Sequence, residues 1–281
     1  MLRKRLVVAI LLLAASCSLQ PENVLRLATT TSTYDSGLLN EILPGFELQF
    51  NVRVDVVAVG TGQALALGRR GDADLLLVHE PIGEAAFVRD GHGTMRYPVM
   101  FNDFIIVGPG NDPAQIRGMR EAKIAFKRIA EQEATFISRG DGSGTFVREQ
   151  RLWELADLHP SAGVEWYLSV GQGMGESLQM AAEMQAYTLT DRGTFLALAH
   201  KLQGLDSLVG GNAVLENEDP ELLNIYSLIP VNPEVHTAVQ FDLAMQYVNW
   251  MLAPDIQRQI LGFGNSSIGA GLFLAIDSLP E

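Results

Sequence analysis

Ser-Arg-Gly-Asp-Gly-Ser-Gly-Thr, residues 138–145, is the stretch around which the rest of the chain can be organised. An apolar run at 135–137 precedes it, and apolar residues recur at helical spacing from Phe146 onward, so the pattern predicts a strand-to-helix turn. Its glycines bring backbone N–H groups close to a ligand, and the helix directs its unpaired N-terminal amides to the same point. Taken alone, the turn is equally typical of an ordinary helix cap.

A second polar stretch has the same chemistry. Thr-Thr-Thr-Ser-Thr, residues 29–33, lies between a strand-like run at 24–28 and a short helix expected at 36–43. Thr61, between two glycines, is a further neutral donor. Each of these has a simpler explanation as a helix cap or a solvated loop. Two hydroxyl-rich turns in one chain nevertheless favour an anion site.

The N-terminus predicts export. A basic start at 1–5, an apolar run at 6–15 and small residues before Cys17 indicate a signal peptide over residues 1–16, too short to span a bilayer as a mature helix. Ala-Ala-Ser-Cys at 14–17 resembles a bacterial lipobox, so Cys17, the only cysteine, is expected to carry a lipid anchor in the periplasm or at the cell surface. The alternative is ordinary cleavage with Cys17 incidental.

Length and charge limit the classes of partner. Removal of residues 1–16 from the 281-residue chain leaves enough for two lobes, without an internal disulfide. The formal net charge of −13, which becomes more negative when Arg3, Lys4 and Arg5 are lost, argues against nucleic acid or anionic lipid as a partner. An anionic ligand would therefore depend on local donors in a dehydrated pocket.

Strand and helix patterns alternate along the chain and predict an α/β fold. Strands are expected at 24–28, 52–59, 74–78, 104–108, 135–137, 168–170, 187–190 and 225–231. Near-continuous apolar strands indicate mostly parallel sheets, so the loops at 29–33, 60–62 and 79–81 should meet beyond their carboxyl ends. We predict lobe 1 from 24–107 and 223–281, lobe 2 from 108–222, and a two-strand hinge near 104–108 and 222–230.

Four stretches in matching order resemble a known family, the tungstate-binding proteins of bacterial ABC importers. They are Ala-Thr-Thr-Thr-Ser-Thr at 28–33, Gly-Asp-Ala-Asp-Leu-Leu-Leu-Val-His at 71–79, the turn at 138–145, and Tyr-Thr-Leu-Thr-Asp-Arg at 187–192. The resemblance implies a type II periplasmic-binding-protein fold whose two lobes close over tungstate or molybdate. It also implies delivery of that anion to a membrane permease driven by an ATPase.

The resemblance places the family's anion site on the hydroxyl loop and on the arginine turn. Its features fall on Thr30, Thr31, Ser32, Arg139, Ser143 and Thr145. Thr61, Gly144 and Met174 complete the candidate ligand-binding set, the last because the glycine-rich loop 171–175 can turn its amides to the cleft. The side chain of Met174, with those of Met180 and Met184, is expected to pack in the core.

The donor chemistry favours a fully ionised oxyanion, which accepts hydrogen bonds and donates none. The loops at 29–33 and 60–62 contain no acid, whereas a protonated phosphate would need an acceptor. The turn at 138–145 does contain an acid, Asp141, and we expect this residue to orient Arg139 or its own turn instead of facing the anion. Phosphate transport and an anion-sensing lipoprotein remain alternatives.

Catalytic signatures are missing from the sequence. It contains neither a Gly-x-x-x-x-Gly-Lys phosphate loop nor a Gly-x-Ser-x-Gly nucleophile elbow, and its five histidines lack metal-ligand spacing. We therefore expect no catalytic residue, no cofactor, no resident metal and a monomer, with a phosphate-ester hydrolase as the least favoured reading.

Overall fold

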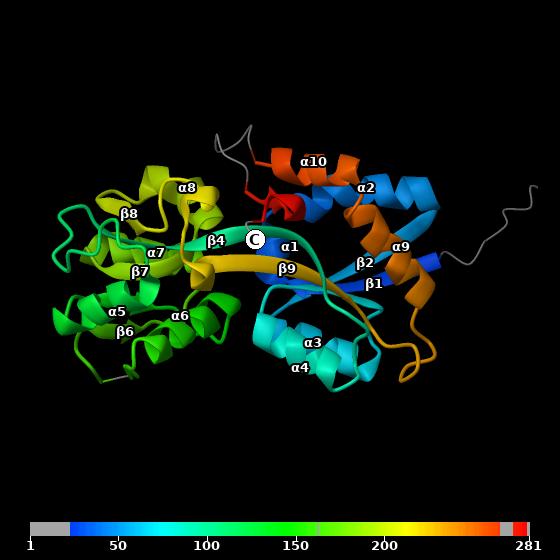
Figure 1. Cartoon of the computed structure of the whole chain (residues 1–281), viewed down its shortest axis with the longest axis horizontal. Helices are drawn as coiled ribbons and strands as arrows, with labels where there is room; N and C mark the ends of the chain where they lie inside the picture. The colour runs from blue at the N-terminus through cyan, green and yellow to red at the C-terminus, as the bar shows by residue number, and fades with distance from the viewer. Residues whose placement is uncertain (1–22, 162, 265–271, 280–281) are drawn as a thin grey trace, which may run out of the picture.

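The computed structural model describes residues 23–161, 163–264 and 272–279. The predicted signal peptide and Cys17 lie outside these residues. The described chain forms two lobes joined by a pair of long strands that run from one lobe into the other (Figure 1). In the described part, none of the helices is long and apolar enough to cross a membrane.

Lobe 1 is built on three parallel strands, with β1 between β2 and β3. The strands are β1 (Asn23–Thr30), β2 (Val52–Val59) and β3 (Leu75–Val78). The helices are α1 (Thr31–Asp35), α2 (Leu38–Phe50), α3 (Thr61–Arg70), α4 (Pro81–Arg89), α9 (Phe241–Met251) and α10 (Pro254–Gly262). The predicted βα alternation of this lobe is confirmed.

Lobe 2 repeats this design, with β5 lying between β6 and β7 and parallel to both. Its strands are β5 (Phe136–Ser138), β6 (Tyr167–Ser169), β7 (Tyr187–Asp191) and β8 (Leu205–Val209). Its helices are α5 (Ala122–Glu131), α6 (Gly144–Leu155), α7 (Met174–Met184) and α8 (Arg192–Leu198). Short 3-10 helices occur at Ala199–Lys201, Val214–Glu216, Pro220–Leu222 and Ile276–Ser278.

Two strands, β4 (Tyr97–Pro109) and β9 (Leu223–Pro230), join the lobes. β4 pairs antiparallel with β9 up to Asp103, and from Phe104 onward it pairs with β7 of lobe 2. β9 continues beside β3, and the two-residue strand β10 (Leu274–Ala275) also pairs with β4. The sheet is therefore mixed, with parallel pairs inside each lobe and antiparallel pairs at the crossing. The predicted lobe limits at 107/108 and 222/223 stay predictions.

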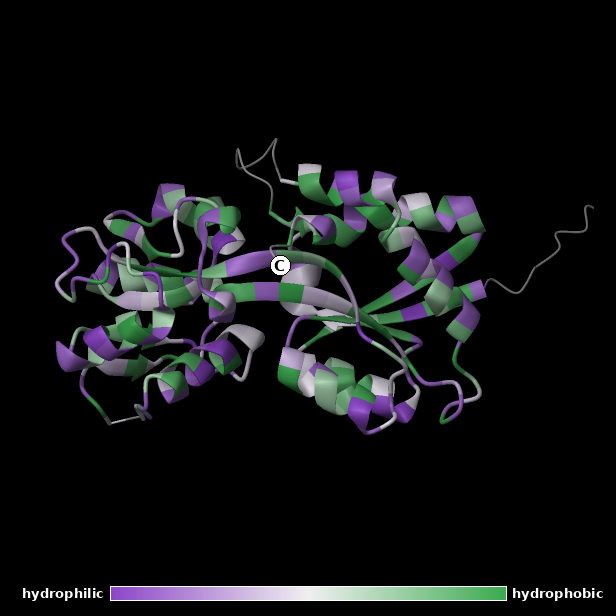
Figure 2. Cartoon of the chain, in the orientation of Figure 1, coloured by the Kyte–Doolittle hydropathy of each residue, from purple (hydrophilic) through white to green (hydrophobic). Residues whose placement is uncertain are grey.

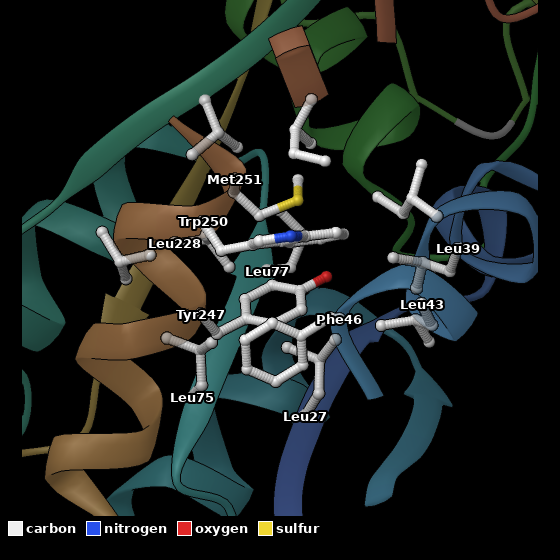
Figure 3. Packing of buried hydrophobic residues seen from close by; sticks show 14 of the residues in the cluster. Leu27, Leu39, Leu43, Phe46, Leu75, Leu77, Leu228, Tyr247, Trp250 and Met251 are labelled. Atoms are coloured by element: carbon white, nitrogen blue, oxygen red, sulfur yellow. The ribbon is translucent and has the colours of Figure 1, made fainter. Parts of the chain in front are cut away.

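Each lobe has its own hydrophobic core. In lobe 1, Phe46 of α2 packs against Tyr247 and Trp250 of α9, with ring centroids 4.8 and 5.3 Å apart, over leucines of the sheet (Figure 3). In lobe 2, the Phe126 and Trp153 ring centroids are 4.3 Å apart. The helices carry both hydrophobic and hydrophilic residues, as expected where one face covers a sheet (Figure 2). Separate cores allow the lobes to move as units about β4 and β9.

Candidate functional site

A cleft of about 550 Å³ lies between the lobes. It is bordered by residues from lobe 1, the crossing strands, lobe 2 and the segment before β10. These are Thr31, Ser32, Asp35, Ser36, His79, Asn102, Phe104, Arg139, Thr145, Gly173, Met174, Gly175, Glu176, Asp191, Gly193, Thr194, Ala197, Leu198, Asn224, Tyr226, Leu272 and Phe273. The contact between Thr30 and His79 confirms the predicted meeting of the loops at 29–33 and 79–81, two of the three expected at the carboxyl ends of the strands.

The hydroxyl stretch at 29–33 divides into an inner and an outer set. Thr29 is buried and donates to the carbonyl of Leu77 at 2.8 Å, while Thr30 caps α1 by accepting from the Thr33 amide. Thr31 and Ser32 are exposed on the first turn of α1 and line the cleft. The inner hydroxyls therefore hold the loop, and the outer ones are available to a ligand.

The turn at 138–145 has the geometry that its glycines allow. Gly140 and Gly142 have φ values of +62° and +71°, in the left-handed region that favours glycine. Ser143 then caps α6 by accepting from the amide of Phe146 at 3.3 Å. The predicted strand-to-helix turn is confirmed, and the first turn of α6 points its N-terminal end toward the cleft, where Thr145 lines the wall.

Arg139 is the positively charged group of the cleft wall. Its side chain is 15% exposed, and its Nη2 pairs with the carboxylate of Asp141 at 2.5 Å. Its Nη1 lies 3.5 Å from the Thr145 hydroxyl, and its buried Nε has no hydrogen-bond partner among the described residues. Because its side chain keeps this exposure and lines the cleft, the Arg139 guanidinium can donate to an anion there.

Asp141 supports the turn, in agreement with the sequence-based hypothesis. One carboxylate oxygen pairs with Arg139, and the other accepts from the Ser143 amide at 3.1 Å. Burial by itself would raise the pKa of Asp141, but the hydrogen bonds from Ser143 and the charge of Arg139 outweigh it and lower that pKa. Asp141 is absent from the cleft wall, so its charge faces the arginine and the turn.

The nine predicted ligand residues fall into different places. Thr31, Ser32, Arg139, Thr145 and Met174 line the cleft, and Met174 also packs in the core of lobe 2. The remaining four, Thr30, Thr61, Ser143 and Gly144, are not among the residues that line it. Gly144 instead brings the lobes together, since a Cβ there would lie 3.3 Å from His79 Cε1 and 4.0 Å from Thr61 Oγ1. The role of these nine residues as ligands stays a prediction.

Several cleft residues were not predicted from the sequence. His79, Asn102, Asn224 and Tyr226 form a buried polar wall on β3, β4 and β9. They come from three separate strand segments of mixed or apolar sequence, and only the fold brings them together. His79, one of the five histidines without metal-ligand spacing, is buried with both ring nitrogens bonded.

Three carboxylates also border the cleft. They were not predicted, because the loops at 29–33 and 60–62 contain no acidic residue. They are Asp35, Glu176 and Asp191. Asp191 caps α8 by accepting from the Thr194 amide at 2.8 Å. Glu176 belongs to the first turn of α7, where a negative charge is favourable. Within the described residues, no group of three or more histidine, cysteine, aspartate or glutamate side chains is arranged to hold a metal ion.

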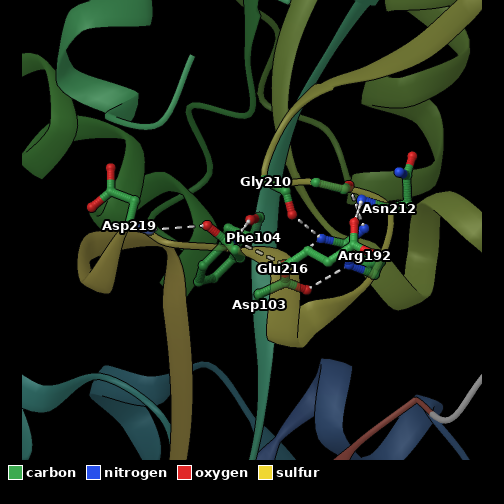
Figure 4. Close-up of polar contacts among 9 residues, drawn as sticks. Asp103, Phe104, Arg192, Gly210, Asn212, Glu216 and Asp219 are labelled. Atoms are coloured by element: carbon green, nitrogen blue, oxygen red, sulfur yellow. Dashed lines mark hydrogen bonds and ion pairs between the residues drawn. The ribbon is translucent and has the colours of Figure 1, made fainter. Parts of the chain in front are cut away.

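A buried ion pair fixes the point where β4 passes between the lobes. Asp103 accepts from Arg192 Nε and Nη2 at 2.9 and 2.6 Å, and Arg192 also donates to the carbonyl of Gly210 at 2.6 Å (Figure 4). Burial raises the pKa of Asp103, although the Arg192 guanidinium opposes this shift. The pair ties α8, which borders the cleft, to the crossing strand.

Two α/β lobes, two crossing strands and a donor-bearing cleft define a periplasmic-type solute-binding protein. A family model described as a PBP superfamily domain matches residues 20–255. The tungstate-binding protein TupA of Peptoclostridium acidaminophilum is 45% identical over 256 residues, covering 90% of this chain and 86% of that protein. The chain therefore belongs to the TupA family of tungstate-binding proteins.

Solved structures agree with this family. The tungstate-binding protein TupA from Desulfovibrio alaskensis G20 has a TM-score of 0.79 and 42% identity, covering 90% of this chain and 98% of that one. The tungstate ABC transporter structure from Geobacter sulfurreducens has a TM-score of 0.70 and 47% identity, covering 84% of this chain and 96% of that one. The α/β two-lobed fold expected from the sequence is confirmed.

Proposed function

We propose that this protein binds tungstate between its lobes and delivers it to an ABC permease for uptake. The named relatives are tungstate-binding proteins of this length and fold. The observation that carries the proposal is the shared cleft, to which Thr31 and Ser32 contribute from lobe 1 and Arg139 and Thr145 from lobe 2. An anion that accepts from both sets holds the lobes together.

The donor groups of the cleft suit an anion held mainly by neutral donors, although three carboxylates, Asp35, Glu176 and Asp191, also border it. Arg139 is the only arginine or lysine among the described residues that line it. Hydroxyls and backbone amides supply the remaining donors, and a tetrahedral dianion can accept from all of them. Because molybdate offers the same acceptors in nearly the same shape, we propose that it is a second ligand of the site.

Calorimetric titration with tungstate, molybdate, sulfate and phosphate at neutral pH tests this function. We expect tight binding of tungstate and weak binding of sulfate and phosphate. Tight phosphate binding would instead indicate that one of the cleft carboxylates, such as Asp191, accepts from a protonated ligand. If none of the four anions binds, the transport function is rejected and a sensor or a hydrolase is favoured. A phosphate-ester assay would then distinguish the hydrolase from the sensor.

Export and anchoring form a separate proposal. We infer cleavage after residue 16 and lipidation of Cys17, because the basic, apolar and small-residue segments occur in the order that export requires. Cys17→Ser should release the protein from the membrane fraction, and mass spectrometry of the wild-type N-terminus should show the acyl mass. Gel filtration of the released form tests the expected monomer.

A further inference from the structure

His79 is a buried titratable side chain of the cleft wall, just after β3. Its ring stacks on Tyr226 with centroids 4.5 Å apart. Its Nδ1 lies 3.0 Å from Asn224 Oδ1, and its Nε2 lies 3.1 Å from Thr30 Oγ1. The Cε1 edge of the ring faces Gly144, the first residue of α6, where an added Cβ would lie 3.3 Å from it. His79 therefore joins the hydroxyl loop, a crossing strand and the second lobe.

The surrounding amides determine which ring nitrogen carries the proton. Asn224 Nδ2 donates to Asn102 Oδ1 at 2.7 Å and to the Tyr226 hydroxyl at 3.1 Å, so its Oδ1 faces the ring. A carbonyl oxygen only accepts, and Nδ1 of His79 must therefore donate to it. Burial lowers the pKa of His79 to about 4, and the charge of Arg148 on α6 acts in the same direction. The ring is neutral at physiological pH, which leaves Nε2 as an acceptor.

This assignment uses the only hydroxyl proton of Thr30. Thr30 donates to His79 Nε2, so its oxygen can only accept from its other neighbours. The Thr33 hydroxyl at 2.6 Å and the Thr33 amide at 3.3 Å fill its two acceptor positions, so the Ser32 hydroxyl, 3.2 Å away, keeps its proton for a ligand. Thr30 thus has no proton left for a ligand, and it holds the first turn of α1 in place.

We propose that His79 is a positioning residue of the anion site. Its unprotonated Nε2 fixes the Thr30 hydroxyl, which accepts from Thr33 and so holds the turn that presents Thr31 and Ser32 to the cleft. The inference rests on the proposed oxyanion-binding function and adds that Thr30 organises the site without donating to the anion. It also explains why Thr30 lies behind the cleft wall, whereas Thr31 and Ser32 line it.

The nitrogen chemical shifts of His79 in the ligand-free wild-type protein test the proton assignment directly. Selective ¹⁵N labelling of histidine, with assignment by loss of the signal in a His79 variant, distinguishes the two neutral tautomers. We expect a protonated Nδ1 and an unprotonated Nε2 from pH 5.5 to pH 8. A protonated Nε2 or a charged ring in this range would overturn the inference.

Two substitutions separate the two ring nitrogens. His79→Gln places an amide near the position of Nε2 and can accept from Thr30, whereas His79→Asn keeps only the donor toward Asn224. Because His79→Asn leaves the buried Thr30 hydroxyl without its acceptor, we expect tungstate affinity to fall at least about tenfold in this variant. In His79→Gln it should stay within about threefold of wild type by the same reasoning.

The control is His236→Asn, since His236 Nε2 lies 3.0 Å from the Arg69 carbonyl, away from the cleft. It should leave tungstate affinity unchanged. Equal losses in His79→Gln and His79→Asn, or no loss in either, would overturn the positioning role. If the wild type binds no oxyanion, the proposed function fails, while the tautomer measured without ligand still decides the proton assignment.

Discussion

Arg139 combines two interactions that work against each other. Its guanidinium is largely buried and paired with Asp141, so part of its charge is neutralised before an anion arrives. The pairing also fixes its orientation, because Asp141 is itself held by the Ser143 amide. A preorganised arginine loses little freedom on binding, and Arg139 lines the cleft where the ligand is expected.

Replacement of Arg139 by alanine tests the importance of this charge. We expect Arg139→Ala to weaken tungstate binding by about 100-fold or more, since truncating one partner of a buried charged contact typically costs 2–5 kcal/mol. Titration calorimetry measures the change. Arg117→Ala is the matched control, because Arg117 of the same lobe is half exposed and pairs with Asp206 on the surface. An unchanged affinity in Arg139→Ala would contradict the site.

Glu149 provides a prediction of pH-dependent stability. Its buried carboxylate accepts from Trp153 Nε1 and the Tyr167 hydroxyl at 3.1 and 2.8 Å, and burial raises its pKa from 4.5 to about 7. Between pH 4.5 and 7 the folded protein keeps a proton on Glu149 that the unfolded chain has released. The stability that the protonated Glu149 contributes is therefore lost as pH rises from about 4.5 to 7. His79 contributes with the opposite sign, being destabilising as pH falls from 6.5 to about 4.

Glu149→Gln should therefore be more stable than the wild type at pH 8, by up to about 3 kcal/mol, and close to it at pH 4.5. Glutamine keeps the accepting oxygen without the buried charge. Urea unfolding at both pH values measures the difference. Glu154→Gln, on the exposed side of the same helix, serves as the control and should show no such pH dependence. A destabilised Glu149→Gln at pH 8 would contradict the prediction.

Among single residues, the sequence analysis identified those cleft residues whose role follows from their immediate neighbours in the chain. Ser32 and Arg139 belong to hydroxyl-rich or glycine-rich turns after strands, and both line the cleft. His79 and Asn224 are 145 positions apart, and each has an apolar or mixed neighbourhood in the sequence. Their contact depends on the antiparallel pairing of β3 with β9, which no local pattern encodes.

Among the elements, the turn between β5 and α6 depends on two glycines that are not equivalent. Gly140 and Gly142 both have positive φ. A Cβ on Gly140 would collide with the Ser169 hydroxyl of β6, whereas a Cβ on Gly142 would meet nothing within 4 Å. Substitution at Gly142 therefore measures backbone strain alone, and substitution at Gly140 adds a steric clash with the neighbouring strand.

We expect Gly142→Ala to lower the free energy of unfolding by about 1–2 kcal/mol, the cost of a left-handed conformation for a residue with a Cβ. Gly140→Ala should cost clearly more. Adding Ser169→Ala removes the hydroxyl and should restore part of the Gly140→Ala loss, without helping Gly142→Ala. Urea unfolding of the single and double variants tests this, and equal losses at both glycines would contradict the clash.

The order and type of the elements followed the sequence closely, and their ends did not. The helix expected at 36–43 begins at Leu38 and continues to Phe50, because Phe46 and neighbouring residues pack on α9. The strand expected from Phe104 begins at Tyr97, since β9 supplies its partner over residues 97–103. Tertiary contacts thus extend elements beyond the segments that local pattern identifies.

For the molecule as a whole, the crossing strands explain how a small ligand can change the shape of a large chain. β4 changes its partner between Asp103 and Phe104, and the Asp103–Arg192 pair ties this point to α8 beside the cleft. From the sequence we predicted a two-strand hinge near residues 104–108 and 222–230. The sequence could not show the pair itself, because Asp103 and Arg192 are 89 positions apart.

Lobe closure is the prediction that follows from this arrangement. Hydroxyls of lobe 1 and Arg139 of lobe 2 can satisfy one anion only when the lobes are held together, so tungstate should favour the closed state. We expect the radius of gyration from small-angle X-ray scattering to fall when tungstate is added to the ligand-free protein. Arg139→Ala at the same tungstate concentration should keep the ligand-free value, because one lobe has lost its charged donor. A compact wild type that does not change on binding would show instead that the two separate cores already sit in the closed arrangement, and that the anion enters without hinge motion.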